Sequence, residues 1–224
     1  MTRRTMNDKR PRGRWLLVGL LLCLLGAGGG QAQNAKSILD KAVAAYERAN
    51  GLRVDFSVRT RQGDQPAGDW SEGTIQMRGD KFLLETADTK TWFDGTTQWT
   101  YVERNEEVNI TTPTGEELRF TNPALLLGIH KKGFKPVYKG ESTASNGKLA
   151  YDIELTPEKR SDITRVELQV EKATGLPLRV EVTARNGVTS TIRVDNIRTG
   201  LNQPDATFVF NEEAYPEAEM VDLR

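Results

Sequence analysis

The segment from Ile75 to Val102 constrains the fold most strongly. It reads IQMRGDKFLLETADTKTWFDGTTQWTYV, in which short runs of apolar, aromatic and β-branched residues are separated by Gly-Asp at 79–80 and Asp-Gly at 94–95. Period-two alternation interrupted by such turn dipeptides predicts a meander of antiparallel strands. Because aromatic residues stand on both sides of the second turn, we expect the resulting sheet to have an aromatic, apolar face.

The period of two continues on both sides of this segment. Upstream, Leu52, Val54, Phe56 and Val58 alternate with polar residues, which is typical of a strand with one wet face. Asn-Gly at 186–187, flanked by alternating residues, is the strongest hairpin signal. Further strands are predicted at 107–112, 136–138, 149–155, 163–171, 178–184, 188–197 and 207–210. About eleven strands without βαβ spacing predict a mainly β, antiparallel fold, either a sandwich or an incompletely closed barrel.

Two helices are expected. The segment from Asn34 to Asn50 has an apolar stripe at helical spacing and a charged opposite face, with Asn34 as a possible cap and Gly51 placed to end it. A second, short and very apolar helix is predicted after Asn122 and Pro123 and ends before Gly133. Two interpretations of the short helix are open: a core plug between two strands, or a lid that lines a cavity.

The amino terminus has the pattern of an export signal. A basic head precedes an apolar run from Trp15 to Leu25, and small residues follow. The run is 11 residues long, about 16 Å as a helix against a hydrocarbon core of roughly 30 Å, so it is too short to span a membrane as a retained anchor. Leu22 is not the small residue that would make Cys23 a lipoprotein acylation site. We therefore predict a cleaved signal peptide over 1–32 and one domain over 33–224.

Composition excludes several classes of function. Without residues 1–32 the chain has 25 basic and 30 acidic residues, a net charge of about −5, which argues against nucleic acid as a partner. The chain has one histidine, His130, and its one cysteine lies in the signal peptide. No nucleophile, metal or phosphate-loop motif occurs, so no catalytic residue, metal or cofactor is predicted. A hydrolase that uses a pair of carboxylates stays open as an alternative.

Six features in order resemble the outer-membrane lipoprotein carrier proteins, the LolA family. They are the N-terminal helix, F-S at 56–57, E-G-x-x-x-x-R-x-x-x-F over 72–82, D-G-x-x-x-W-x-Y over 94–101, the Pro-led apolar helix, and T-F-x-F at 207–210. Each motif is weak alone, but their order and spacing together are fairly specific. The resemblance extends from about Ala35 to the end of the sequence.

The resemblance implies a half-open antiparallel barrel with an apolar concave face and helices that cover it as a lid. Members of the family are periplasmic carriers, not enzymes. They receive acylated lipoproteins from an inner-membrane lipoprotein-releasing transporter and pass them to an outer-membrane acceptor. We expect this chain to do so as a monomer.

Two residues match functional positions of the family. Arg78 matches an arginine that latches the lid, and Phe82 matches an aromatic residue that contributes to hand-over of the cargo. Strict alternation would place Arg78 on the face opposite Ile75 and Met77 unless the strand bulges. A solvated arginine beside a turn is therefore the alternative interpretation of Arg78.

The length of the acyl chains determines how tightly such a cavity would bind them. Burying an acyl chain of about sixteen carbons contributes about 12 kcal/mol at ~0.8 kcal/mol per CH₂. Three fully buried chains would exceed the practical limit of roughly −20 kcal/mol for reversible binding, so a carrier needs a lid that costs energy to open or a partly wet cargo. A regulatory or sensory module of the same fold, binding lipid or protein, is the alternative function. The residues that we expect to line the cavity, each of which could equally be ordinary core, are Phe56, Val58, Trp92, Trp99, Tyr101, Leu125, Leu126 and Leu127.

Overall fold

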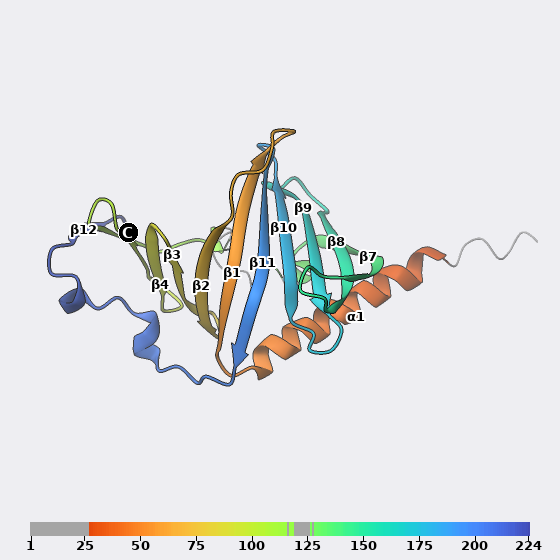
Figure 1. Ribbon diagram of the computed structural model, residues 1–224, viewed down its shortest axis with the longest axis horizontal. Helices are drawn as coiled ribbons and strands as arrows, with labels where there is room; N and C mark the ends of the chain where they lie inside the picture. The colour runs from red at the N-terminus through yellow and green to blue at the C-terminus, as the bar shows by residue number, and fades with distance from the viewer. Residues whose placement is uncertain (1–26, 116, 119–125, 127) are drawn as a thin grey trace, which may run out of the picture.

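The computed structural model describes residues 27–115, 117–118, 126 and 128–224, with side chains from residue 34 (Figure 1). Most of the predicted signal peptide, the greater part of the predicted apolar helix, and Leu125 and Leu127 lie outside the described residues.

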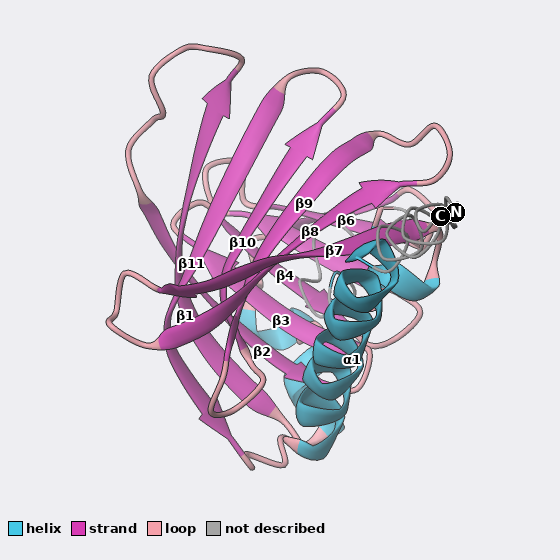
Figure 2. Cartoon of the chain, turned by 90° about the vertical axis from the view of Figure 1, so that its right-hand side faces the viewer, coloured by secondary structure: helices cyan, strands magenta, loops and turns pink. Residues whose placement is uncertain are grey.

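One sheet of twelve strands forms the described part of the molecule, in the order β12-β6-β5-β4-β3-β2-β1-β11-β10-β9-β8-β7. The end strands β12 and β7 do not pair with each other, so the sheet is curved but open (Figures 1 and 2). The expected mainly β, half-open barrel is thereby confirmed. The strands are β1 Leu52–Gln62, β2 Ser71–Arg78, β3 Lys81–Thr86, β4 Thr89–Phe93, β5 Gln98–Val102, β6 Glu107–Thr111, β7 Phe134–Thr143, β8 Leu149–Pro157, β9 Ile163–Glu171, β10 Pro177–Ala184, β11 Val188–Thr199 and β12 Glu219–Asp222.

The turns fall where the sequence predicted them. Gly79, Gly95 and Gly187 have φ angles of 63°, 105° and 85°, a region that glycine adopts without steric cost. These turns join β2 to β3, β4 to β5 and β10 to β11, and each pair is antiparallel. The register of the meander is thus fixed by turns that are readable in the sequence.

The carboxyl-terminal segment differs from the prediction. Residues 207–210 do not form a strand: Asp205–Phe208 is a short 3₁₀ helix, η2, which follows Pro204, and a second one, η3, spans Glu212–Ala214. The final strand is β12, which pairs in parallel with β6, whereas all other neighbouring strands are antiparallel. The alternation T-F-V-F therefore places two phenylalanines against the sheet without adding a strand to it.

The helix α1, Ala27–Arg48, covers one face of the sheet, which we call the inner face (Figure 2). It begins before the predicted Asn34, and Gly51 follows its end with a φ of 89°. Its buried residues pack with those of β7 to β10 and with Leu126 and the 3₁₀ helix η1, Ile129–Lys131. The helical members of this cluster are Ala35, Ile38, Leu39 and Ala42.

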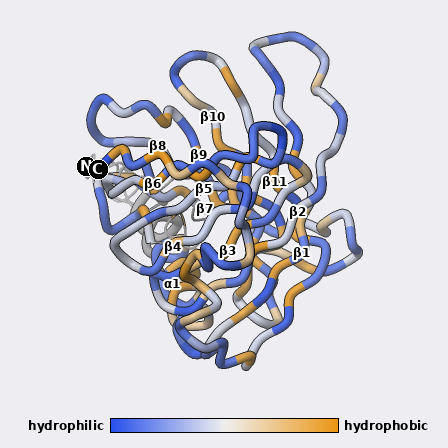
Figure 3. Tube along the Cα trace, turned by 90° about the vertical axis from the view of Figure 1, so that its left-hand side faces the viewer, coloured by the Kyte–Doolittle hydropathy of each residue, from blue (hydrophilic) through white to orange (hydrophobic). Residues whose placement is uncertain are grey.

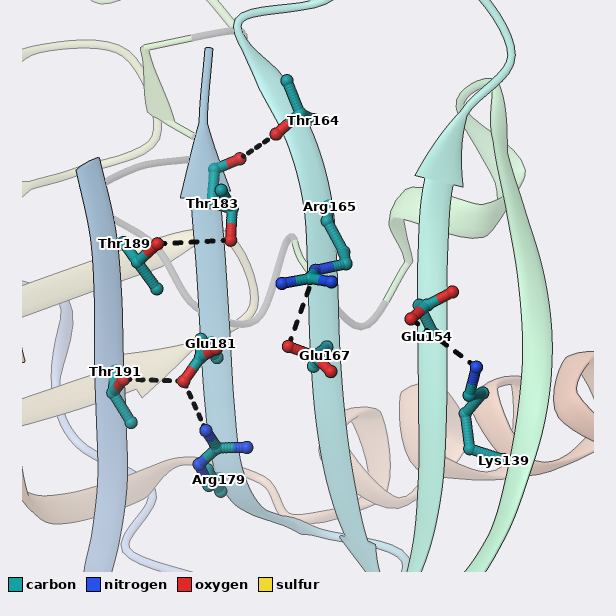
Figure 4. A network of polar contacts seen from close by, with 10 residues as sticks. All are labelled: Lys139, Glu154, Thr164, Arg165, Glu167, Arg179, Glu181, Thr183, Thr189 and Thr191. Atoms are coloured by element: carbon teal, nitrogen blue, oxygen red, sulfur yellow. Dashed lines mark hydrogen bonds and ion pairs between the residues drawn. The ribbon is translucent and has the colours of Figure 1, made fainter. Parts of the chain in front are cut away.

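The opposite, outer face is polar over β7 to β11. Figure 4 shows threonines and ion pairs on adjacent strands of this face, including Arg179 with Glu181 and Arg165 with Glu167. The hairpin loops that project beyond the sheet are also mainly hydrophilic (Figure 3). Over β3 to β6 the outer face is apolar instead, and residues 200–224 cover it. This covering segment, which we call the strap, buries Phe208 and Phe210.

Candidate functional site

An apolar cavity lies on the inner face, between the end of α1 and strands β1, β2, β10 and β11. Its volume is about 50 Å³, about a third of the roughly 150 Å³ of an engineered cavity that binds benzene. In this conformation the cavity is therefore too small for an acyl chain. The lining residues are apolar apart from one tyrosine hydroxyl: Tyr46, Leu52, Val54, Phe56, Ile75, Met77, Leu176, Pro177, Val180, Ile192, Val194 and Ile197.

The ring of Phe56 is accommodated by two local features. Gly73 lies opposite Phe56 on β2, and a Cβ atom there would come 2.6 Å from the Cζ atom of the ring. On the other side, the register with β11 shifts between Asp55 and Phe56, which leaves Asp195 as an extra residue. The Ser57 hydroxyl donates a hydrogen bond of 2.6 Å to Asp195. The motif F-S and the glycine of E-G thus shape one wall of the cavity.

The end of α1 is fixed to the rim of the cavity by Tyr46. Its hydroxyl donates a hydrogen bond of 2.6 Å to the carbonyl oxygen of Gly79, in the turn between β2 and β3. Burial of the hydroxyl, with a smaller effect of the Asp80 carboxylate, raises the pKa of Tyr46 to about 12. Tyr46 is therefore a neutral donor at physiological pH and connects the helix to the sheet above the cavity.

The middle of α1 is fixed by Asp40. Its carboxylate lies 3.0 Å from Lys131 Nζ and 3.1 Å from His130 Nε2, both in η1. Hydrogen bonds from Lys131 first, and then from His130, lower the pKa of Asp40. Polar contacts thus hold α1 at two points, through Asp40 in its middle and through Tyr46 near its end.

The residues that the sequence predicted for the cavity lie on both faces of the sheet. Phe56 lines the cavity, and Val58 follows it on the same face, opposite Ile192. Leu126 is buried in the cluster beneath α1. Phe82 is fully buried on the inner face, with its ring 5.4 Å from that of Phe93. The sequence did not predict Tyr46 or the residues of β10 and β11 as cavity lining, and it marked Gly73 only as part of the E-G motif.

Trp92, Trp99 and Tyr101 lie on the outer face, beneath the strap. The rings of Trp92 and Phe210 are 5.2 Å apart, and those of Tyr101 and Tyr215 are 4.8 Å apart. These three aromatic residues therefore do not line the cavity. The reason is strand parity, because Phe93 faces α1 and its neighbour Trp92 must face the other way.

Arg78 also points to the outer face. Its guanidinium forms an ion pair with Asp205 of η2 and lies 5.9 Å from the ring centre of Phe208. Lys81 reaches the same carboxylate at 3.0 Å. Ile75 and Met77 line the cavity, so alternation turns Arg78 away from it. The described contacts of Arg78 are thus with the strap and not with α1.

Metal and membrane-spanning features are not found in the described part of the chain. Among these residues no cluster of three or more His, Cys, Asp or Glu could hold a metal ion. None of the described helices is both long enough and apolar enough to cross a bilayer.

Comparison with known proteins gives one family match. The model of the family described as "Outer membrane lipoprotein carrier protein LolA" matches residues 25–171. This region includes α1, β1 to β9 and six of the twelve residues that line the cavity. No curated protein sequence matches the chain.

The chain is also similar to solved structures, including the following three. An uncharacterized conserved protein from Thermus thermophilus has a TM-score of 0.58 at 15% identity, covering 85% of this chain and 99% of that one. A putative outer membrane lipoprotein-sorting protein domain from Vibrio parahaemolyticus has a TM-score of 0.46 at 13% identity, with 82% and 99% covered. A LolA superfamily protein from Nitrosomonas europaea has a TM-score of 0.40 at 15% identity, with 79% and 97% covered.

Proposed function

The chain belongs to the outer membrane lipoprotein carrier protein family, and from that premise we propose that it is a periplasmic, non-enzymatic carrier of acylated lipoproteins. The apolar cavity under α1 is the proposed binding site for the acyl chains. An inner-membrane transporter is the proposed donor and an outer-membrane protein the proposed acceptor. The observation that carries the proposal is the lining of the cavity, in which eleven of twelve side chains are apolar.

The volume of the cavity requires α1 to move when cargo binds. The end of the helix at Tyr46 covers the cavity, whereas residues 35–42 pack into the core beneath β7 to β10. We therefore propose that α1 is the lid and that its Tyr46 end is displaced first. The contact between Tyr46 and Gly79 is a single hydrogen bond, which contributes about 0.5–1.5 kcal/mol.

The energy balance favours such an opening. Each buried CH₂ contributes about 0.8 kcal/mol, so two methylene groups offset the loss of the Tyr46 hydrogen bond. The remaining carbons of a long acyl chain then offset the repacking of the helix. An empty carrier stays closed by the same reasoning, because exposing the apolar lining to water without cargo has no compensation.

Filling the cavity tests the proposal. Val194 lines the cavity on β11, and Val194→Phe would occupy its space. Val137 on β7 pairs with Glu154 of the outer-face network, so Val137→Phe adds the same bulk away from the cavity. Binding of a fluorescent fatty-acid analogue is measured by titration, with thermal unfolding as the control for folding, since overpacking costs about 1–3 kcal/mol.

We expect wild type and Val137→Phe to bind the analogue and Val194→Phe to bind it at least about tenfold more weakly, a loss of about 1.4 kcal/mol. Absence of binding by the wild-type protein would contradict the carrier function. Crosslinking in the cell tests the partners: many lipoproteins are expected for a carrier, whereas a single dedicated membrane protein would indicate a regulatory module. Cell fractionation tests the periplasmic location.

A further inference from the structure

Unpaired positive charge is concentrated at one end of the molecule. In the described part of the chain from residue 34, seven Lys and Arg side chains have no ion pair, hydrogen bond or ring contact. One is Arg48, at the end of α1. The other six, which we call the basic rim, are Lys36, Lys41, Lys132, Lys135, Lys159 and Arg160, and all six are exposed.

Three elements bring the basic rim together. Lys36 and Lys41 flank Asp40 on α1, and Asp40 contacts η1 through His130 and Lys131. Lys132 and Lys135 follow η1 directly. The turn between β8 and β9, which carries Lys159 and Arg160, is joined to the same place by a hydrogen bond of 2.9 Å from the Glu158 N–H to the Gly133 carbonyl.

The opposite end of the sheet has the opposite charge. The strap has six acidic residues and a single basic one, Arg224, and it ends in β12. The strap starts beside the end of α1, where the Gly200 N–H donates to the Ala49 carbonyl, but it ends in β12, and β12 and β7 are the two ends of the sheet order (Figure 1). The protein is therefore an electric dipole although its net charge beyond residue 32 is negative.

We propose that the basic rim docks on the anionic surface of a phospholipid bilayer. The dipole would orient the protein with the rim towards the lipid headgroups and the acidic strap away from them. Lys36 and Lys41 flank an open patch on one face of α1 that also contains Asp40. Docking in this orientation brings α1, the proposed lid, to the membrane from which acyl chains emerge. This role of the docking surface rests on the proposed carrier function.

Binding to lipid vesicles that contain no lipoprotein tests the docking surface directly. The purified protein is sedimented with vesicles of phosphatidylcholine alone or of phosphatidylcholine mixed with phosphatidylglycerol. We expect binding only to the anionic vesicles and loss of that binding at high salt, because screening shortens the range of the field. Equal binding to both kinds of vesicle, or binding to neither, would overturn the proposal. The rim would then be assigned to binding an acidic protein surface instead.

A matched pair of triple variants locates the surface. Lys36→Gln, Lys41→Gln and Lys132→Gln together remove three charges from the rim. Each lysine near an anionic surface strengthens binding by about fivefold, so we expect the triple variant to bind anionic vesicles at least tenfold more weakly.

The control variant, Arg104→Gln, Arg198→Gln and Arg224→Gln, removes the same charge outside the rim and should bind the vesicles as wild type does. A similar loss in both triple variants would overturn the assignment to the rim. Titration with the fatty-acid analogue separates the two proposals, because the rim variant should retain acyl binding. Loss of acyl binding in the wild type would contradict the carrier function without affecting the vesicle result.

Discussion

Removing one oxygen atom from Tyr46 should make the proposed carrier easier to open. Tyr46→Phe keeps the ring that lines the cavity and removes the hydroxyl that donates to Gly79 at 2.6 Å. The closed position of α1 loses this contact, whereas the apolar lining is unchanged. The helix remains packed through Ile38, Leu39 and Ala42, so the variant should stay folded.

The expected magnitude follows from the value of one hydrogen bond. A net contribution of about 0.5–1.5 kcal/mol corresponds to a roughly 2- to 12-fold shift of the equilibrium between closed and open helix. When the open form is a minor population, the apparent dissociation constant is inversely proportional to the open fraction. Tyr46→Phe should therefore bind an acyl chain about 2- to 12-fold more tightly than wild type.

Titration with the fluorescent fatty-acid analogue measures this change, and stopped-flow mixing measures the rate of entry. Tyr101→Phe is the matched control, because its hydroxyl lies on the outer face near Tyr215 and away from the cavity. We expect Tyr101→Phe to bind the analogue with the same affinity as wild type. Unchanged or weaker binding by Tyr46→Phe, with normal thermal unfolding, would refute the idea that this hydrogen bond holds the lid closed.

Three further predictions concern stability and the strap. Phe208→Ala should lower the free energy of unfolding by about 3–5 kcal/mol in urea titrations, because the ring is fully buried. Arg78→Leu should fold and bind acyl chains normally but expose residues 200–224 to faster proteolysis, since it breaks a partly exposed ion pair with Asp205; trapped lipoprotein in the cell would instead favour the lid-latch role. The pKa of Tyr46 is raised to about 12, so its contribution to stability is complete below about pH 10 and declines towards pH 12, and wild type should lose more stability over this range than Tyr46→Phe does.

The fold was predictable because local signals agreed with one another. Asn-Gly and Asp-Gly turns set the hairpins, and clean alternation such as Leu52, Val54 and Phe56 identified the buried face. The start of α1 was not predictable in this way. Three consecutive glycines at 28–30 lie within the helix from Ala27, and glycine is a poor helix former, so propensity favoured a later start.

The cavity was only partly predictable, because alternation identifies a buried face only when the other face is polar. In β3 and β4 the neighbouring residues Phe82 and Leu83, and Trp92 and Phe93, are all buried, one of each pair on each side of the sheet. Such pairs of adjacent buried residues indicate that both faces of the sheet are buried, and they do not show which residue of the pair faces the cavity. The aromatic residues of the strap were the available signal that the outer face is covered. If Phe208 and Phe210 do not form a strand, they need an apolar surface to pack against.

Burial on both faces has a mechanical consequence for a carrier. Over β3 and β4 the outer side is packed beneath Phe208 and Phe210, independently of α1 on the inner side. Displacement of the helix end at Tyr46 would therefore uncover the cavity walls while the strap still holds that half of the sheet from behind. A sheet with α1 as its only packed layer would lose its main core when the lid opened. The strap would therefore support β3 to β6 if the Tyr46 end of α1 moved, whereas β7 to β10, whose outer face is polar, keep their core only while residues 35–42 of α1 stay packed.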